Sequence, residues 1–351
     1  METPSPSSGD RASTVTPRPQ GAKVVRFVGR NLLRLLLLFP IAWCFGAVYF
    51  DGPFPGTGNL VIGVLWLALL GCLLFRARSG RGRWLTLAAG LAVVIVPWSF
   101  KQPSNDRNWS PEYARTAGAT IDGDAVTITN YRNFDYALDG SVTERWETRT
   151  VHLSKLRGID FFLNYWGSPL IAHPIFSFDF GDEGHIAFSI ETRREKGEVY
   201  TTLGGLYKLY ELCYLVGDER DFVRVRTNIR KDEDAYLFRL SAPPEQARAR
   251  FLEYVTQIQN LAKKPRFYNV LTANCTTAIR SQLHVQKKSI PDWRLLLNGK
   301  LDEMFAEHGL FAVKDLPLSE LKEKGHVDER ALQAQDDPQF SQKIRIGVPG
   351  Y

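Results

Sequence analysis

Three long apolar runs with hardly a charge occupy the chain before residue 101, and no such run follows them. A helix rises about 1.5 Å per residue and the hydrocarbon core of a bilayer is roughly 30 Å thick, so runs of this length predict membrane-spanning helices. We expect these three helices at Leu32–Phe50, Asn59–Phe75 and Trp84–Phe100. A cleavable signal peptide is disfavoured for the first run, because more than thirty residues precede it and two further runs follow.

After residue 100, apolar and polar positions alternate over short distances, which is typical of a folded domain in water. The chain begins with a Pro-, Ser- and Gly-rich stretch that reads as flexible. In order we expect a flexible cytoplasmic tail, a transmembrane region, a linker, a folded domain and a C-terminal extension, at residues 1–31, 32–100, 101–122, 123–306 and 307–351.

The outer domain opens with strand-like segments and continues with helices. A period of two predicts strands at Ala125–Tyr131, Glu144–Leu153, Asp160–Trp166, Leu170–Phe180, Ile186–Arg194, Asp221–Asn228 and Ala235–Leu240. Apolar positions at helical spacing after Pro243 and Pro244 predict a helix at Glu245–Ala262, and another begins near Asn274. Strands followed by helices indicate an α+β domain with a mostly antiparallel sheet.

The fourth and fifth strands form a hairpin around Gly181–His185 whose register can be argued from its aromatic residues. Placing Phe180 opposite Ile186 gathers the large apolar side chains on one face. His173 then lies on the other face, where Glu191 is opposite Ile175 and diagonal to His173. His185 is left at the tip of the loop, far from His173.

The basic residues beside the apolar runs give the orientation of the membrane region. They lie before or at the edge of the first run and between the second and third runs, whereas Asp51–Gly58 has none, which predicts a cytoplasmic N-terminus and an outer domain in the bacterial periplasm. They are Arg11, Arg18, Lys23, Arg26, Arg30, Arg34, Arg76, Arg78, Arg81 and Arg83.

Composition excludes some classes of protein. With 44% hydrophobic and 12% aromatic residues, the chain can bury enough apolar surface to fold. The net charge of +6 is explained by the orientation of the apolar runs, so we infer no nucleic-acid partner. The sequence has no Cys-x-x-Cys, His-Glu-x-x-His or Gly-x-x-x-x-Gly-Lys motif, so we expect no metal, nucleotide or other cofactor.

The four cysteines differ in their surroundings. Cys44 and Cys72 lie in the apolar runs and Cys213 lies in the apolar segment Leu212–Val216, whereas Cys275 lies in a polar sequence. Asn274 is a good N-cap, which would place Cys275 in the first turn of a helix, where free N–H groups stabilise a thiolate. Cys275 is therefore a candidate nucleophile, with a small residue at a helix start, or a disulfide to Cys213, as the alternatives.

A nucleophilic thiolate needs a base, and His173 is the candidate because Glu191 can orient its imidazole as the third member of a triad. Two alternatives stay open: His173 is a packed strand residue, or Glu191 forms a salt bridge with Arg193 or Arg194 instead. The remaining histidines, His152, His284, His308 and His326, have polar surroundings typical of a solvated surface.

Several short motifs resemble the Lnb N-terminal periplasmic domain family over roughly residues 125–290. They are Asn130–Phe134, Arg145–Arg149, Tyr165–Gly167, Ile171–His173, Ser189–Glu198, Tyr210–Leu212 and Tyr268–Thr277.

The resemblance implies a membrane-tethered domain outside the cytoplasm with a permuted papain-like, NlpC-type thiol-enzyme fold, in which the catalytic His precedes the Cys. By position, His173 and Cys275 would be that pair, and Asn274, Arg193 and Tyr268 lie in the shared motifs as supporting residues. The family's named member transfers an acyl chain onto the N-terminal cysteine of a lipoprotein.

We therefore expect a thiol acyltransferase or hydrolase with membrane lipids or lipoproteins as partners. A cell-wall amidase or endopeptidase, and a binding or assembly module without catalysis, are the alternatives.

Overall fold

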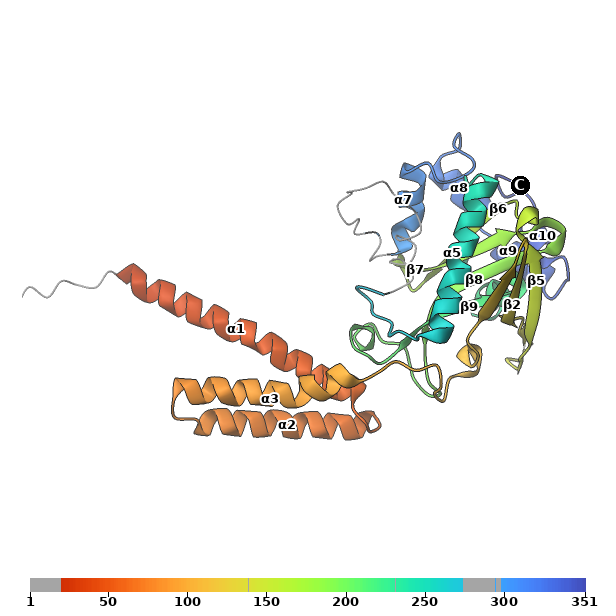
Figure 1. The fold of residues 1–351 in the computed structure, drawn as a ribbon. Coiled ribbons are helices and arrows are strands. Elements are labelled where there is room, and N and C mark those ends of the chain that lie inside the picture. The colour runs from red at the N-terminus through yellow and green to blue at the C-terminus, as the bar shows by residue number, and fades with distance from the viewer. Residues whose placement is uncertain (1–19, 138, 231, 274–293, 295–297) are drawn as a thin grey trace, which may run out of the picture. The chain divides into compact units, whose positions relative to one another are not determined.

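The computed structural model describes residues 20–137, 139–230, 232–273, 294 and 298–351, without the side chains of residues 20–30 and 32–34. The chain divides into two compact units, Met1–Phe100 and Lys101–Tyr351 (Figure 1).

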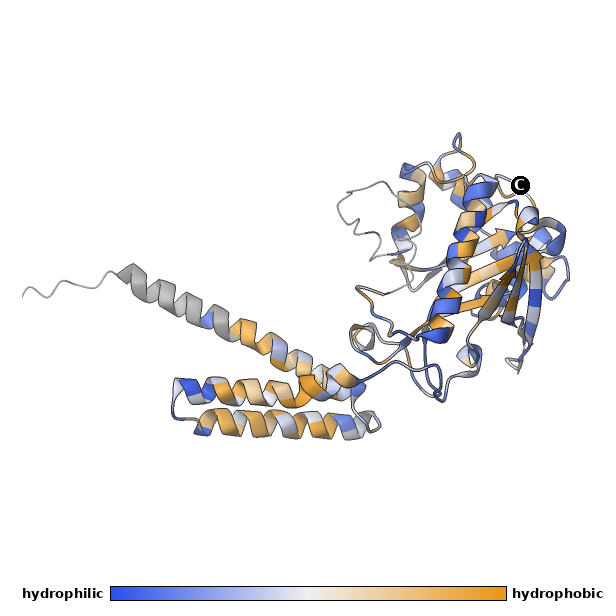
Figure 2. Cartoon of the chain, in the orientation of Figure 1, coloured by the Kyte–Doolittle hydropathy of each residue, from blue (hydrophilic) through white to orange (hydrophobic). Residues whose placement is uncertain are grey.

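The first unit consists of helices α1 (Gln20–Asp51), α2 (Gly56–Arg76) and α3 (Gly80–Phe100). Among the side chains that the structure describes, only α2 and α3 are long and apolar enough to cross a membrane, so the expected three spans are corrected to two candidates. The described apolar part of α1, Leu35–Asp51, is too short to count as a third. Figure 2 shows α2 and α3 as mainly hydrophobic along their length.

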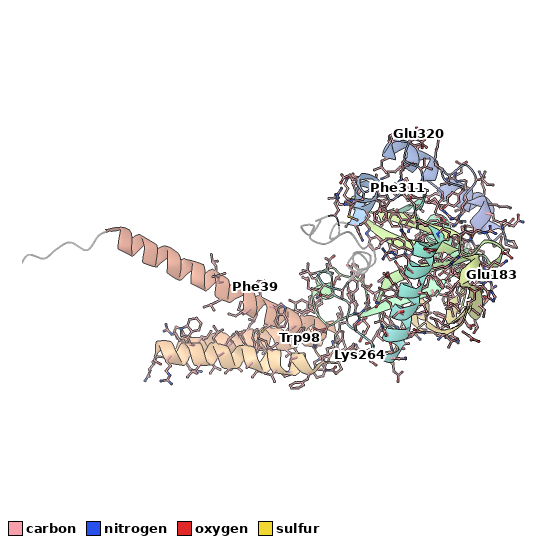
Figure 3. The ribbon with its side chains drawn as sticks, turned by 45° about the horizontal axis from the view of Figure 1, so that its top comes forward. Phe39, Trp98, Glu183, Lys264, Phe311 and Glu320 are labelled. Atoms are coloured by element: carbon pink, nitrogen blue, oxygen red, sulfur yellow. The ribbon has the colours of Figure 1, made fainter. Side chains whose placement is uncertain are left out.

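Polar groups close the turns of this helical unit. Asn59, buried near the start of α2, accepts a hydrogen bond from the Phe54 N–H at 3.0 Å and donates to the Tyr49 carbonyl at 3.1 Å. Near the end of α3, the indole of Trp98, labelled in Figure 3, donates to Asp51 at 2.6 Å and packs edge-on against Trp43. These bonds satisfy polar groups that the apolar sequence around them would leave unpaired.

The second unit is built on one eight-stranded sheet in the order β1-β2-β9-β8-β7-β6-β10, with β5 paired to β2. The β2–β9 pair is parallel and the other pairs are antiparallel, so the sheet is mixed. Two short strands form a separate pair, β3 (Asp135–Tyr136) and β4 (Val142–Thr143). The strands of the large sheet are β1 (Gly118–Asp122), β2 (Ala125–Arg132), β5 (Trp146–His152), β6 (Gly158–Trp166), β7 (Ser168–Asp179), β8 (His185–Arg193), β9 (Glu211–Gly217) and β10 (Glu233–Arg239).

One face of the sheet is covered by α5 (Pro244–Lys263) and α7 (Leu301–Glu307), as the aromatic positions of the hairpin predicted. Phe178 and Phe180 lie 5.2 and 4.9 Å from the ring of Phe251 on α5. Phe311, labelled in Figure 3, extends this core by stacking on Phe238 at 4.8 Å. Burial of these rings supplies much of the driving force for packing α5 against the sheet.

The register of the β7–β8 hairpin differs from the expected one by two residues. Phe178, not Phe180, is opposite Ile186, and Ile175 is opposite Ser189. The strands continue to Asp179 and His185, because the chain reverses in a short turn in which the Phe180 N–H donates to the Gly184 carbonyl. A shift of two residues keeps every side chain on its face, so the apolar face is as predicted while the cross-strand partners change.

The opposite face is covered by the C-terminal helices, which the sequence did not predict. Helices α9 (Asp328–Ala334) and α10 (Phe340–Lys343) lie there, and their apolar side chains join a core with β6, β7, β9 and β10. The preceding helix α8 (Leu318–Gly325) instead contributes Leu321 to the core on the α5 side. The segment expected as a strand at Asp221–Asn228 is instead the end of α4 (Glu219–Phe222) and a π-helical turn, Val225–Ile229. Asp218 caps α4 by accepting from the Arg220 N–H, which starts a helix where an alternating pattern favoured a strand.

A buried ion pair fastens the C-terminal layer to the sheet. Arg345 donates to Asp160 on β6 at 2.6 Å and to Glu219 on α4 at 2.5 Å, and both carboxylates are fully buried. Burial raises the pKa of Glu219, but the guanidinium outweighs it and holds that pKa at about 2. Arg239 also contacts Asp160, at 2.8 Å.

Residues 101–122, expected as a linker, are packed into the outer domain, and their last five residues form β1. The Ser104 N–H and Arg107 both bind Glu211 of β9, at 3.2 and 2.8 Å. Asn105 donates to the Leu261 carbonyl at the end of α5. The segment that follows α3 is thus anchored to β9 and α5.

We predict that Arg345→Met destabilises the outer domain by about 3–5 kcal/mol, because it leaves the buried Glu219 carboxylate without its counter-ion. Chemical unfolding followed by tryptophan fluorescence measures this. Lys324→Ala is the matched control, since its ion pair with Glu320 is exposed to solvent and contributes little to stability. An equal decrease of the free energy of unfolding in the two variants would contradict the role given to Arg345.

Glu211 gives a second prediction, on pH. Burial raises its pKa to about 7 despite the neighbouring Arg107, and its Oε2 has no partner among the described atoms. The folded state therefore binds a proton that the unfolded state has released, and stability falls as the pH rises from about 4.5 to 7, by roughly 3 kcal/mol. Glu211→Gln should flatten this part of the profile, measured as the urea midpoint at each pH. If the urea midpoint of Glu211→Gln falls with pH as steeply as that of the wild type, the role given to Glu211 is wrong.

Candidate functional site

His173 and Glu191 meet on the face of the sheet that the C-terminal layer covers. His173 lies on β7 and Glu191 on the neighbouring strand β8, two residues beyond the last pair of these strands, Ile175 with Ser189, and the register continued to them sets them opposite rather than diagonal. Their Nε2 and Oε1 atoms are 3.1 Å apart. Ser189, two residues before Glu191, completes the arrangement, with its Oγ 2.6 Å from His173 Nε2 and 2.6 Å from Glu191 Oε1.

The hydrogen bonds assign the tautomer of His173. An ionised carboxylate can only accept, and the single Ser189 hydroxyl proton is donated to Glu191. The Nε2 atom of His173 must therefore carry a proton, which it shares between Ser189 and Glu191. In the neutral ring this leaves Nδ1 as the basic nitrogen, and none of the described residues donates to it.

Glu191 stays ionised although it is buried. Burial raises the pKa of its carboxyl, but His173, Arg226 and the Ser189 hydroxyl together hold the pKa well below its ordinary value. Arg226 comes from the π-helical turn Val225–Ile229 and lies 3.4 Å from Glu191 and 2.8 Å from Glu233. Such turns are uncommon and often occur at functional sites.

A cavity of about 670 Å³ opens onto this group. His173, Glu191 and Arg226 line it, and so do Tyr200 and Tyr268. A second cavity of about 460 Å³ lies next to it and shares Tyr113, Glu191, Arg226 and Arg230 as lining residues. The volumes are in the range that accommodates a small ligand or one end of a larger one.

The candidate nucleophile Cys275 and its N-cap Asn274 lie outside the described residues. The preceding turn is described, however: Asn269 pairs with Ala273, and the Val270 N–H donates to the Gly205 carbonyl at 2.8 Å. Val270 and Tyr268 both line the larger cavity. Cys275 follows Ala273 by two residues, a reach of roughly 7 Å along the chain.

The two other supporting residues have different surroundings. Tyr268 lines the cavity and its N–H donates to the Tyr210 carbonyl at 2.9 Å. Arg193 is buried away from the cavity lining, where it donates to the Tyr113 carbonyl at 2.9 Å and lies 4.4 Å over the ring of Trp109. It therefore holds the segment that follows α3, while the ion pair to Glu191 is made by Arg226.

Cys213 is a free thiol on β9, directly opposite Glu191. Two strand spacings, or roughly 10 Å, separate it from His173 on β7. Burial raises the pKa of this thiol to about 11. A protonated thiol at that distance from the base is unsuited to nucleophilic attack.

Two clusters have the residue types of a metal site. Asp160, His185 and Glu219 lie together, but Arg345 binds both carboxylates, so the cluster is an ion-pair network. His185 is thus partly buried at the far end of the hairpin, opposite Asp179, as the first residue of β8 rather than a residue of the loop. The second cluster, Asp234, His326 and Asp328, is largely exposed.

Sequence reasoning gave no role to Ser189, Arg226 or Arg230. Ser189 had a usable signal, because Ser189 and Glu191 share a face by the period of two. Arg226 had none, since its position depends on a π-helical turn where a strand was expected.

Comparison with known proteins agrees with the motifs. Searches of curated proteins and of solved structures found no match. A family model does match, over residues 142–299, which include His173, Ser189 and Glu191. The described apolar helices α2 and α3 fit a membrane-anchored protein. The model that residues 142–299 of this chain match is that of the Lnb N-terminal periplasmic domain family.

Proposed function

We propose that this protein is a membrane-anchored thiol acyltransferase or hydrolase of the bacterial cell envelope, with its outer domain in the periplasm and Cys275 as nucleophile. The observation that supports it most directly is the His173–Ser189–Glu191 arrangement, which leaves Nδ1 of His173 as a base beside a cavity. The turn from Asn269 to Ala273 lies at that cavity and leads to Cys275.

In the proposed reaction, His173 Nδ1 takes the proton of the Cys275 thiol, and the thiolate attacks an acyl carbonyl. The bond to the leaving alcohol or amine breaks, the leaving group takes the proton back from Nδ1, and a thioester to Cys275 remains. An acceptor amine or water then attacks the thioester, again giving its proton to Nδ1, which restores the thiol. Glu191 and Ser189 hold the Nε2 proton through both steps.

Ser189 itself is a poor candidate nucleophile. Its side chain is almost fully buried and its hydroxyl proton is directed to Glu191. A hydroxyl that donates to a carboxylate and accepts from Nε2 orients the imidazole instead. We therefore assign Ser189 a positioning role.

The membrane anchor favours a lipid-linked or lipoprotein substrate. Arg76, Arg78, Arg81 and Arg83 lie at or between the ends of α2 and α3 and favour a cytoplasmic position for that loop, so the residues after α3 reach the periplasm, where such substrates occur. A cell-wall amidase or endopeptidase uses the same thiol chemistry and is the second candidate. The third is a binding or assembly module that lacks activity.

We predict that Cys275 is alkylated by iodoacetamide at pH 7 at least tenfold faster than a cysteine with its ordinary pKa of about 8.5, because a nearby imidazole stabilises the thiolate. His173→Gln should remove this advantage, and Glu191→Gln should reduce it by loosening the ring. Mass spectrometry of the labelled peptides gives the rates.

Cys213 is the control within the same molecule, because burial and its raised pKa should keep it unlabelled until the protein is unfolded. Slow labelling of Cys275 in folded protein, with no response to His173→Gln, would favour the module without activity.

The substrate class is tested by incubating the detergent-solubilised protein separately with a diacylated lipoprotein and with muropeptides. We expect acyl transfer or release from the lipoprotein, and no product with Cys275→Ala or His173→Gln. Product from muropeptides alone would replace the acyl-transfer proposal with the cell-wall one.

A further inference from the structure

Large apolar side chains are exposed around the mouth of the 670 Å³ cavity. Trp166, Leu170 and Ile171, at the β6–β7 turn, line the cavity and are still 37–42% exposed. Elsewhere in the outer domain, Val199, Leu203 and Leu271 are 75%, 64% and 57% exposed. Their chain neighbours Tyr200, Thr202 and Val270 line the same cavity. We call these six exposed residues the apolar rim.

The two segments that carry the second half of the rim are joined to each other. The Val270 N–H donates to the Gly205 carbonyl at 2.8 Å, and the Val270 side chain lies so close to Gly205 that a Cβ there would meet it at 2.5 Å. Val199, Leu203 and Leu271 therefore belong to one connected surface. Six large apolar side chains left in water at one mouth indicate an interaction surface rather than scattered exposure.

The same loop is tied to the residues that follow the membrane helix. Lys208 donates from Nζ to the Lys101 carbonyl at 3.1 Å, and Lys101 is the residue immediately after α3. Glu211, three residues further on, holds Ser104 and Arg107. A residue directly after a membrane-spanning helix lies at the bilayer interface whichever way the helix is oriented. The loop that carries Val199 and Leu203 is thus followed by a residue bound to the position next to α3 in the chain.

We propose that the apolar rim inserts into the interface of the membrane in which the protein is anchored, so that the cavity opens toward the acyl chains. Exposed Leu, Ile and Val with one Trp are the composition of an interfacial contact. Insertion of the rim into the membrane does not depend on catalysis. The proposal rests on the proposed function only for the identity of the molecule that enters the cavity.

Depth-dependent quenching of a fluorophore tests the proposal in the full-length protein. Single cysteines at Val199, Leu203 or Leu271, in a background with the four native cysteines replaced by Ala, are labelled with NBD. The protein is reconstituted in phosphatidylethanolamine and phosphatidylglycerol nanodiscs with brominated acyl chains. We expect blue-shifted emission that is quenched several-fold more at the rim than at matched controls on the C-terminal layer, Leu332→Cys and Ile346→Cys, which are 50% and 69% exposed in the wild type.

A second measurement avoids variants. Hydroxyl-radical footprinting of the wild-type protein in nanodiscs should protect Leu203 and Val199 while Leu332 and Ile346 react. Equal quenching and equal reactivity at rim and control positions overturn the proposal. Burial of the rim only after a lipoprotein is added also overturns it and assigns the rim to protein docking.

These outcomes are independent of the proposed chemistry. The labelled variants lack Cys275, so a quenched rim is expected even if the protein proves to have no activity. Conversely, acyl transfer by a protein whose rim is unquenched would overturn the docking proposal and leave the proposed function intact.

Discussion

Buried carboxylates on or against one face of the central sheet have to be matched by arginines, and much of the outer domain is arranged to supply them. Asp160 and Glu219 receive Arg345 from the C-terminal layer, and Glu191 receives Arg226 from a π-helical turn. Asp221 is held by Arg132 of β2 in a paired contact at 2.8 Å. A carboxylate that is buried without such a partner destabilises the fold by several kcal/mol. Removing a layer that supplies an arginine would therefore greatly lower the stability of the domain.

This constraint also prepares the candidate site. The opposite face of the sheet is apolar and packs against α5, which fixes β7 and β8 side by side. The charged face can then hold His173, Ser189 and Glu191 in one hydrogen-bonded group, with Arg226 helping to keep the carboxylate ionised. The imidazole is oriented before any substrate arrives, which is the condition for efficient proton transfer.

The family match ends at residue 299, yet the layer that covers the charged face lies beyond it. In this chain the C-terminal helices contribute Arg345 and a second apolar core, so they belong to the structural unit that carries the site. The segment after α3 joins the same unit through Glu211 and Arg193.

The sequence by itself determined the apolar helices, most strands, helix α5, the family, and the faces on which His173 and Glu191 lie. These follow from local periodicity and motifs, which act within a few residues. It did not determine the strand Glu211–Gly217, the C-terminal layer or the hairpin register, nor the arginine that pairs with Glu191. Only the tertiary structure decided these, because they depend on which distant segment neutralises a buried charge or covers a face. That choice is made by contacts between residues far apart in the chain, where periodicity carries no information.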